Sequence, residues 1–537
     1  MYRILIADPL AEAGLEILRQ AGMEIRLLAP EERPRLAEIV ADFDAMVVRS
    51  MTQVDAELLA AGKSLKVVGR AGIGVDNVDV VAATDRGILV VNAPTANLVS
   101  ATEHTFALLL ALARNVPAAQ ISMRAGEWNR KQFLGSELHG KTLGVVGLGR
   151  IGQGVAARAR AFGMTVLAYD PFLDASAARR LDIELGELDD VIAAADIVTL
   201  HTPLTDQTRN LIDRARIAKM KPGALLVNCA RGGIVDEEAL LVALEEGRLG
   251  GAALDVFAEE PPSDRRLVEH PRVVTTPHIG AQTREAQERV ATETAKMLLA
   301  ALDGSLAVTA VNLPFRSIGG LGEPFLVLGE QLGLLSSSLM AGSFLEIRVD
   351  LWGVDEEVRV PATVAAVKGA LTPFLGEAVN FVNAEKVAAG RGVEIVRSTH
   401  HQSGEYPHLV AVTLKGEAGE VSVAGTVFAE RDPRVVQIEG YRLEFRPKGF
   451  LLVLRNLDVP GVVGKVGTLL GEAGVNIAEI HLARQPAGAE AMAVVRLDAA
   501  LEPAILEALT GIPEITQVTM IDLGGLGESA PPRQEEL

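Results

Sequence analysis

Three features of the sequence predict an α/β protein with two doubly wound parallel sheets, followed by two smaller α+β units. Short runs of Val, Ile and Leu alternate with helical stretches over about the first 313 residues, the pattern of βαβ units. A Gly-x-Gly-x-x-Gly turn at residues 147–152 follows one such run and opens a helical stretch. Aromatic residues make up only 4% of a chain that is 49% hydrophobic, so aliphatic side chains must fill the cores, as they do around buried parallel strands.

Length and charge narrow the class further. A chain of 537 residues exceeds what one hydrophobic core usually serves, so several domains are expected. Its formal charge of −19 repels the phosphate backbone of nucleic acids. No apolar run approaches the roughly 18 residues of a membrane-spanning helix, and the first residues predict a strand and turn rather than a signal peptide. The single cysteine suits a reducing compartment. We therefore expect a cytoplasmic protein that binds neither nucleic acid nor membrane.

The first domain, over residues 1–98, is predicted to be flavodoxin-like. Residues 284–313 complete it, because the helical stretch 283–302 can carry the chain back onto the first sheet. Arg49 and Arg70 each fall at the end of a predicted strand, where ligands of such sheets bind. The predicted strands are residues 4–7, 24–27, 45–48, 65–68 and 89–91, and the predicted helices are residues 11–20, 32–41, 55–60 and 78–85.

The second domain, over residues 99–283, is predicted to be a Rossmann domain. It begins with a helix over residues 101–114 and a loop over residues 126–140. About six strands follow with helices between them, at residues 142–146, 165–169, 197–200, 225–228, 252–255 and 273–275.

The glycine-rich turn of the second domain indicates a dinucleotide site. Gly147, Gly149 and Gly152 lie between a strand and a helix, where backbone N–H groups can approach a pyrophosphate. Asp170 closes the next strand about 20 residues on, the position that binds the ribose hydroxyls in this fingerprint. A carboxylate there repels a 2′-phosphate, so NAD is favoured over NADP. The alternative is a purely structural glycine turn.

Three polar residues follow strands of the second domain, and the strand-end rule brings them together. Arg231 can bind a carboxylate bidentately and polarise the adjacent carbonyl. His278 can exchange the proton that accompanies hydride transfer, and Glu260 can hold the imidazole oriented and protonated. The alternative is three ordinary surface-loop residues. Together with the dinucleotide fingerprint, the set predicts a dehydrogenase.

Beyond residue 314 the character of the chain changes. A glycine-rich linker at residues 319–324 leads to a domain over residues 315–448, with helical stretches and then strands around residues 394–438. Residues 449–523 have the βαββαβ order of a ferredoxin-like module, and residues 524–537 are predicted to be a disordered tail. His400, His401 and His408 lack the carboxylate or cysteine partners of a metal site, so no metal is expected.

The sequence resembles the D-isomer-specific 2-hydroxyacid dehydrogenase family over residues 1 to about 313. Five motifs carry the resemblance: residues 70–77 (RAGIGVDN), 147–152 (GLGRIG), 227–233 (VNCARGG), 253–262 (ALDVFAEEPP) and 276–280 (TPHIG). The resemblance implies an Arg/Glu/His catalytic trio, which falls on Arg231, Glu260 and His278. It also implies that the first domain binds the substrate, and that members form dimers or tetramers through the dinucleotide-binding domain.

The same resemblance implies the ligand contacts. The cofactor residues are Gly147, Gly149, Arg150, Ile151, Gly152, Asp170, Thr202, Cys229, Ala230, Asp255, Gly280, Ala281 and, near the nicotinamide, Ile73. The substrate residues are Arg49, Arg70, Gly72, Asn97, Arg130 and Lys131. Of these, the segment with Arg130 and Lys131 resembles one that reaches into a neighbouring subunit's active site, and the alternative is a solvated charge pair. The arginines and the lysine form the local cation cluster that a phosphorylated substrate needs on this acidic protein.

The whole chain resembles the long members of this family, which carry an intervening domain and a C-terminal ACT domain. Residues 458–477 (DVPGVVGKVGTLLGEAGVNI) are similar to the ACT signature. Asn456, Asp458 and Asn476 correspond to the effector site, where serine binds in regulated members, although Asn456 replaces an aromatic residue found in some of them. The alternative is an ACT module used only for assembly.

These resemblances predict a reaction. The long members oxidise 3-phospho-D-glycerate to 3-phosphohydroxypyruvate with NAD, in serine synthesis, as homo-oligomers. The alternatives are another enzyme of the family, such as a hydroxypyruvate or glyoxylate reductase, and a non-enzymatic NADH-sensing scaffold. The intact Arg/Glu/His trio argues against the scaffold.

Overall fold

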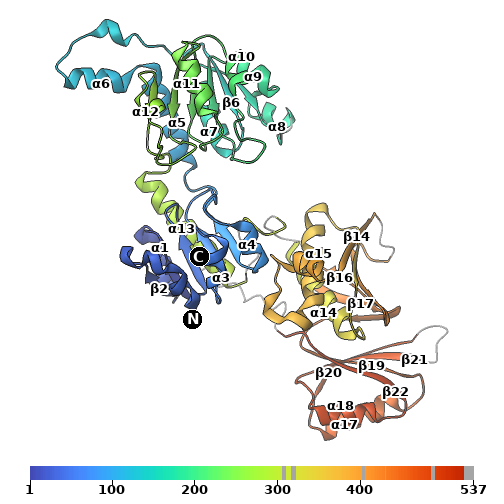
Figure 1. The fold of residues 1–537 in the computed structure, drawn as a ribbon. Helices are drawn as coiled ribbons and strands as arrows, with labels where there is room; N and C mark the ends of the chain where they lie inside the picture. Colours follow the sequence, from blue (N-terminus) through green and yellow to red (C-terminus); the bar gives the residue numbers. More distant parts are fainter. Residues whose placement is uncertain are drawn as a thin grey trace, which may run out of the picture.

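The computed structural model describes residues 1–173, 175–304, 310–315, 322–401, 405–429, 431–484 and 490–524. Its four sheets confirm the predicted fold class, with two parallel sheets followed by a mixed and an antiparallel sheet. In Figure 1 the second domain lies at the top, the first domain below it, and the two C-terminal units to the side. Except for Gly524, the predicted tail lies outside the described residues, as do residues 319–321 of the predicted linker.

The first domain holds a five-stranded sheet of order β2-β1-β3-β4-β5, parallel throughout. Its central strands are buried apolar runs, as expected for a sheet covered on both faces. The predicted single helix over residues 32–41 is wrong, because the ring of Pro34 blocks a continuous α-helix and a 3-10 turn forms instead. The elements are β1 (Arg3–Ile6), α1 (Glu12–Gln20), β2 (Glu24–Leu27), η1 (Pro30–Arg35), α2 (Leu36–Ile39), η2 (Val40–Asp42), β3 (Ala45–Val48), α3 (Ala56–Ala61), β4 (Val67–Arg70), α4 (Val80–Asp85) and β5 (Leu89–Asn92).

Helix α13 (Arg284–Leu302) returns to the first domain and packs against α1, β4 and β5. Two glycines allow the close approach. A Cβ on Gly14 would lie 2.7 Å from the Ala291 carbonyl oxygen, and one on Gly69 would lie 3.1 Å from Leu298 Cδ1. The two large domains are therefore joined twice, by α13 and by the chain entering α5 (Leu98–Ala113).

The second domain holds a seven-stranded parallel sheet of order β12-β11-β10-β9-β6-β7-β8. Sequence analysis missed β8, since two residues are too short for a hydrophobic pattern. The strands are β6 (Thr142–Val146), β7 (Thr165–Tyr169), β8 (Glu184–Leu185), β9 (Ile197–Leu200), β10 (Ala224–Asn228), β11 (Leu249–Leu254) and β12 (Val273–Thr275). The helices that follow α5 are α6 (Val116–Arg124), η3 (Arg130–Phe133), α7 (Arg150–Ala161), α8 (Ala175–Arg180), α9 (Leu188–Ala194), α10 (Arg214–Lys219), α11 (Glu237–Glu245) and α12 (Arg266–Glu269).

Among the described residues, no single helix has the length and apolar character to cross a membrane. The bent pair α5 and α6, with 62° between its helices, meets that test by length and composition only.

The third domain packs helices on a mixed sheet of order β14-β13-β15-β16-β17-β18. Sequence analysis missed β13, which pairs parallel with β14 and antiparallel with β15. Residues 322–324 of the predicted linker instead form the first turn of α14, where a proline is compatible with a helix. The elements are α14 (Gly322–Leu339), β13 (Glu346–Trp352), α15 (Glu356–Leu375), η4 (Gly376–Ala378), α16 (Ala384–Gly390), β14 (Glu394–His400), β15 (Leu409–Gly416), β16 (Gly419–Phe428), β17 (Asp432–Ile438) and β18 (Tyr441–Phe445).

The C-terminal module has the predicted βαββαβ order and an antiparallel sheet of order β20-β21-β19-β22. One face of this sheet packs on its two helices, and Val453, Met492 and Val494 on the other face join the hydrophobic core of the third domain. The third domain and the module therefore share one continuous core. The elements are β19 (Phe450–Leu457), α17 (Val462–Glu472), β20 (Ile477–Arg484), β21 (Glu490–Leu497), α18 (Pro503–Thr510) and β22 (Ile515–Asp522).

Candidate active site

The structure brings the predicted trio to one edge of the second sheet. Arg231, Glu260 and His278 lie in the loops that follow β10, β11 and β12, which are adjacent strands. His278 Nδ1 donates to Glu260 Oε2 at 2.6 Å, and Glu260 Oε1 accepts from the Phe257 amide at 3.1 Å. The second ring nitrogen of His278 therefore remains available, and the side chain is 49% exposed.

The pKa values of this pair move in opposite directions. The hydrogen bond to Glu260 raises the pKa of His278, although burial and the charge of Arg231 oppose it. Burial alone would raise the pKa of Glu260, but the hydrogen bonds from His278 and the Phe257 amide bring it below its usual value. Glu260 is thus ionised at neutral pH and stabilises the imidazolium form of His278.

Asp255 positions the loop that carries His278. Its carboxylate is 1% exposed and accepts from the amides of Ile279 and Gly280, both at 2.8 Å. It also accepts from Thr276 Oγ1 at 2.6 Å and from His104 Nε2 at 3.1 Å. His278 itself has a φ of 53°, so the loop is held in a left-handed turn. Asp255 was predicted to contact the cofactor, and in this structure its oxygens are already occupied by protein donors.

The glycine-rich turn forms the predicted cradle at the start of α7. Gly147 has a φ of 91° and donates its amide to the Tyr169 carbonyl at 2.8 Å. A Cβ on Gly152 would lie 2.1 Å from the Gly147 carbonyl oxygen, so the helix can approach the turn only without one. Gly149 borders open space, and no side chain caps the first turn of α7. Free N–H groups at this helix end suit a pyrophosphate.

Three buried polar atoms near this edge have no protein partner. They are Thr202 Oγ1, Asn97 Oδ1 and Arg70 Nε, and all three belong to residues predicted to bind cofactor or substrate. Buried polar groups are normally paired, so these atoms are available to pair with a bound ligand. With the open cradle at Gly149, they show that the site fits a dinucleotide.

The remaining predicted cofactor residues surround the same edge. Cys229 and Ala230 lie between β10 and Arg231, and burial, with the nearby Asp255, raises the pKa of the Cys229 thiol to about 12. Asp170 accepts from the Leu148 amide at 2.8 Å at the end of β7. The others are Arg150 and Ile151 in the first turn of α7, Gly280 and Ala281 before α13, and Ile73 after β4.

Arg49 and Arg70 lie where the first sheet faces the trio. Burial, together with the charges of Arg231 and Arg49, lowers the pKa of Arg70 to about 10. The three guanidinium groups are therefore within electrostatic range of one another. Gly72 has a φ of 155°, and a Cβ there would lie 1.5 Å from Arg70 Nη1, so its backbone covers that side chain.

Sequence analysis did not identify two residues that position Arg49. Buried Asp8 accepts from the Arg49 amide at 2.7 Å, and Asn77 donates to the Arg49 carbonyl at 2.6 Å. Asp8 also pairs with Arg33 at 2.7 Å. Asp8 directly follows the predicted strand 4–7, at the carboxyl edge of the sheet, and this position was the available signal for it.

Comparison with known proteins identifies the family. Residues 106–280 match the family model of the D-isomer specific 2-hydroxyacid dehydrogenase NAD binding domain. Residues 322–439 match the D-3-phosphoglycerate dehydrogenase intervening domain, and residues 450–514 match the ACT domain. The chain is 40% identical over 526 residues to D-3-phosphoglycerate dehydrogenase of Bacillus subtilis, covering 97% of this chain and 100% of that one. It is 41% identical over 527 residues to the same enzyme of Methanocaldococcus jannaschii, with the same coverage.

The chain belongs to the D-3-phosphoglycerate dehydrogenases. It is therefore an NAD-dependent dehydrogenase, as predicted. Among solved structures, an NAD-dependent formate dehydrogenase of Staphylococcus aureus in complex with NAD is similar, with a TM-score of 0.51 and 32% identity over 57% of this chain and 96% of that one. No cluster of three or more His, Cys, Asp or Glu side chains in the described ranges is arranged to hold a metal ion.

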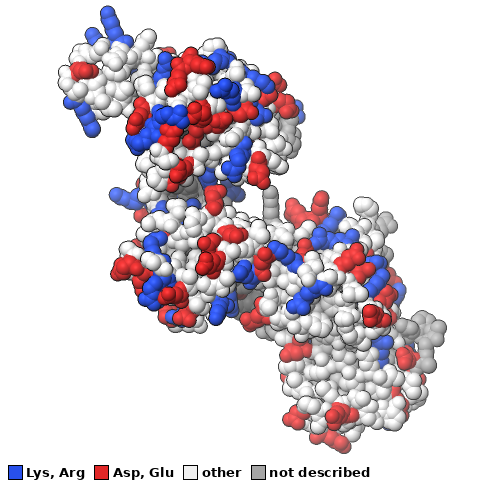
Figure 2. Space-filling view, viewed as in Figure 1, with Lys and Arg blue, Asp and Glu red and all other residues white. Residues whose placement is uncertain are grey.

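Arg130 and Lys131 lie on an arm, residues 116–138, that projects from the second domain. Helix α6 opens the arm, and both residues follow in the exposed turn η3 (Figure 1). Figure 2 shows basic side chains extending from this projection. The charged groups that shift the pKa of Arg70 include Arg49 and Arg231 but neither Arg130 nor Lys131, so these two residues do not join the cation cluster within one subunit.

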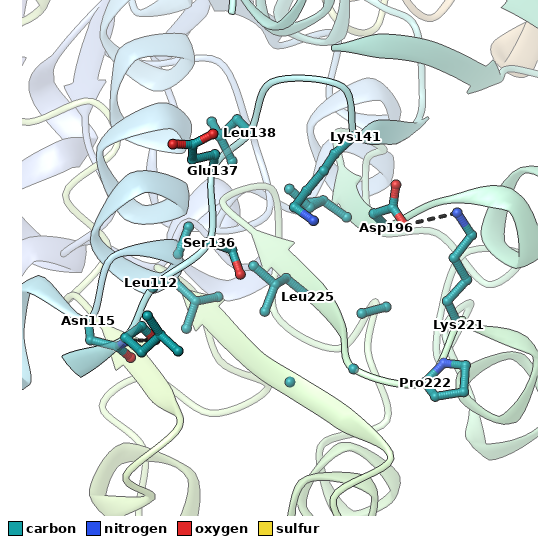
Figure 3. A pocket seen from close by; sticks show the side chains of 17 residues that line it. Leu112, Asn115, Ser136, Glu137, Leu138, Lys141, Asp196, Lys221, Pro222 and Leu225 are labelled. Atoms are coloured by element: carbon teal, nitrogen blue, oxygen red, sulfur yellow. Dashed lines mark hydrogen bonds and ion pairs between the residues drawn. The ribbon is translucent and has the colours of Figure 1, made fainter. Parts of the chain in front are cut away.

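A pocket of about 320 Å³ lies at the opposite edge of the second sheet (Figure 3). Lys141, Asp196 and Ala224 line it from the amino-terminal ends of β6, β9 and β10, and Lys221 pairs with Asp196 at 2.9 Å. Ligands of doubly wound sheets bind at the carboxyl ends of the strands. This pocket is therefore separate from the dinucleotide site.

The predicted effector residues of the ACT module fall into two groups. Asn456 and Asp458 line a pocket of about 500 Å³ beside the start of α17, where Asp458 pairs with Arg484 at 3.2 Å. Asn476 instead pairs with Asp498 at 2.7 Å, at the other end of β20. One module therefore does not bring the three residues together.

The glycine turn gives a paired prediction. Gly152→Ala is expected to destabilise the second domain by about 1–3 kcal/mol, because its Cβ meets backbone. Gly149→Ala meets no protein atom, so its melting temperature should stay close to that of the unmodified protein while the KM for NAD rises at least ~10-fold, since the methyl enters the pyrophosphate space. Thermal melts and NAD saturation curves check both. An unchanged KM in Gly149→Ala would contradict the cradle.

Proposed function

We propose that this chain oxidises 3-phospho-D-glycerate to 3-phosphohydroxypyruvate, the first step of phosphorylated serine synthesis. The observation that carries the proposal is the combination, at one crevice, of the His278–Glu260 pair at 2.6 Å with the guanidinium groups of Arg49, Arg70 and Arg231. A carboxylate and a phosphate carry about three negative charges near neutral pH. The arginines match that charge on an otherwise acidic protein.

In this mechanism each side chain has a defined task. Arg231 binds the substrate carboxylate, and Arg49 and Arg70 bind the phosphate. Neutral His278 accepts the proton of the C2 hydroxyl as the C–H bond at C2 breaks, and Glu260 stabilises the resulting imidazolium. NAD held at the glycine turn would supply the acceptor for the hydride that leaves C2. The products are the 2-keto acid, NADH and one proton held by His278, which balances the oxidation.

A substrate panel tests this proposal. Oxidation of 3-phospho-D-glycerate should show a kcat/KM well above that of D-glycerate, because the phosphate adds charge-assisted hydrogen bonds with arginine. NADH formation at its absorbance band provides the measurement. Equal rates with and without the phosphate would favour a hydroxypyruvate or glyoxylate reductase, and no turnover of any 2-hydroxy acid would favour the NADH-sensing scaffold.

Cofactor choice gives a second prediction. Asp170→Ala should narrow the preference for NAD over NADP, because the carboxylate at the end of β7 no longer repels a 2′-phosphate. The ratio of kcat/KM values for the two cofactors is the measurement, and Asp182→Asn, on the same domain, is the control. Equal use of both cofactors by the unmodified protein would contradict the role of Asp170.

A homo-oligomer is part of the proposal. Apolar side chains on the arm are exposed to an extent unusual for a monomer: Val116 54%, Ile121 68%, Met123 52%, Trp128 76% and Leu134 89%. A second subunit that covers the arm would remove this apolar surface from water. The arm would then place its Arg130 and Lys131 beside the active-site crevice of that second subunit. Sedimentation analysis should give a dimer or tetramer, and a monomer at micromolar concentration would contradict the proposed oligomer.

We further propose a cytoplasmic location for the protein, where the thiol of Cys229 stays reduced.

Regulation by serine through the ACT module is a further part of the proposal. β20 is an edge strand, and antiparallel pairing of two such strands from two subunits would set the Asn476 end of one module beside the Asp458 end of the other. The shared core of the ACT and third domains supports coupling, and Asn380 Nδ2 of the third domain donates to the Gly87 carbonyl of the first domain at 2.7 Å. Serine must bind a less active arrangement more tightly to inhibit.

Calorimetric titration of L-serine into the full chain tests this regulation. Binding should disappear in Asp458→Ala and persist in Glu472→Gln, an exposed carboxylate at the far end of α17. A coupling of the usual ~1–3 kcal/mol would change apparent activity by roughly 5- to 150-fold. Absence of heat and of inhibition at millimolar serine would leave the module as an assembly element.

A further inference from the structure

We infer that Asp76 is a positioning residue that holds Arg231 with its carboxylate-binding edge turned into the crevice. Asp76 belongs to the loop after β4 in the first domain, whereas Arg231 follows β10 in the second. Arg231 Nε donates to Asp76 Oδ2 at 3.0 Å. Within the described part of the chain, this is the only ion pair that links these two domains. The inference rests on the proposed function only in requiring that Arg231 bind the carboxylate of a 2-hydroxy acid.

The hydrogen bonds of Arg231 define which edge remains free. Asp76 takes the Nε edge, and the Ala230 carbonyl accepts from Nη1 at 2.7 Å. One hydrogen on Nη1 and both on Nη2 remain. These atoms form the fork that grips a carboxylate bidentately. Pairing with Asp76 through Nε therefore leaves Nη1 and Nη2 with hydrogens that no residue in the described part of the chain accepts.

The loop that carries Asp76 is built around this contact. A Cβ on Gly74 would lie 2.1 Å from Arg231 Nη2 and 2.6 Å from Asp76 Oδ2, so only glycine allows the backbone to lie against the pair. Next to Asp76, buried Asn77 donates to the carbonyls of Arg49 and Thr52, both at 2.6 Å. The hydrogen bonds of Asn77 thus hold the backbone beside Asp76 in place, although the side chain of Asp76 is itself 62% exposed.

Charge gives Asp76 a second task. Arg231, Arg70 and Arg49 repel one another there, and Asp76 opposes that repulsion at Arg70. Without Asp76 the guanidinium of Arg231 is free to turn away from its neighbours. A displacement of about 1 Å in a substrate-orienting group can cost ~10²-fold in rate.

The two physical effects of Asp76 predict opposite results, which makes the inference testable. A simple charge effect predicts that removing an acidic group strengthens binding of an anionic substrate. Positioning predicts that Asp76→Ala weakens carboxylate binding and lowers kcat, because the Arg231 fork is no longer oriented. Asp76→Glu keeps the charge and the acceptor and should recover most of the loss.

The experiment measures carboxylate binding and turnover separately. Oxalate is titrated calorimetrically into the enzyme–NADH complex, and kcat and KM are measured with 3-phospho-D-glycerate. We expect Asp76→Ala to weaken oxalate binding at least ~10-fold and lower kcat/KM by roughly 10- to 100-fold, with NADH affinity and the melting temperature unchanged. Asp182→Asn, an exposed partner of Arg160, should match the unmodified protein. The Asp76→Ala loss should disappear in an Arg231→Lys background, since Asp76 acts through the fork.

The outcomes separate this inference from the proposed function. Oxalate binding in Asp76→Ala that equals or exceeds that of the unmodified protein overturns the positioning role and leaves the proposed function intact. If Asp76→Ala weakens oxalate binding as expected, but the unmodified protein does not turn over the phosphorylated substrate, the proposed function alone is overturned. Failure of the unmodified protein to bind any carboxylate overturns both.

Discussion

Replacing His278 by alanine is expected to lower kcat for oxidation by roughly 10²- to 10⁴-fold, the usual contribution of a positioned general base. His278 is held at one nitrogen by Glu260 at 2.6 Å, and its other nitrogen is free to accept the hydroxyl proton. The affinity for NADH should change little, because the cofactor cradle is formed by the glycine turn rather than by this ring. Steady-state kinetics and NADH fluorescence titration measure the two quantities.

His401→Ala is the matched control for that prediction. His401 is an exposed histidine of the third domain, so its loss should leave both kcat and NADH affinity unchanged. Full activity in His278→Ala would remove His278 from the mechanism. Loss of NADH binding in His278→Ala would instead indicate a structural role for the loop that Asp255 holds.

The alternation of apolar runs and helices predicted the two parallel sheets because buried parallel strands are continuous apolar segments. This alternation did not predict the structure where an apolar run is very short or where one residue interrupts a helix. The strand β8 has only two residues, and Pro34 divides an otherwise helical segment. The strand β13 was missed because its apolar residues alternate with Glu, Arg and Asp, so it has no continuous apolar run.

The convergence of Arg231, Glu260 and His278 was predictable because strand order converts sequence positions into one edge of a sheet. Residues that hold another residue in place could not be predicted in this way. Asp8, Asn77 and Asp76 bind backbone or side chains of the cation cluster across 41, 28 and 155 residues of sequence. Such contacts depend on the packing of separate loops.

Glu260→Gln is expected to lower kcat by at least ~10-fold, towards the ~10⁴-fold that loss of the orienting carboxylate costs a catalytic triad. The glutamine can still contact the imidazole of His278, but it cannot stabilise the positive charge that forms on it. Glu259→Gln is the control, since Glu259 is an exposed neighbour that accepts from Ser263. Equal kcat in the two variants would contradict the role of Glu260.

The same variant should change the pH dependence with a defined sign. Oxidation requires neutral His278, so its rate falls as the pH drops through the His278 pKa. The hydrogen bond to Glu260 raises that pKa, and Glu260→Gln should therefore move the acidic limb of the oxidation profile to lower pH. Reduction requires the imidazolium, so its alkaline limb should move to lower pH as well. Profiles of kcat/KM in both directions measure this shift. Movement of both limbs in the same direction would identify His278 as the titrating group, because both follow its pKa. An unchanged acidic limb would show that another group titrates.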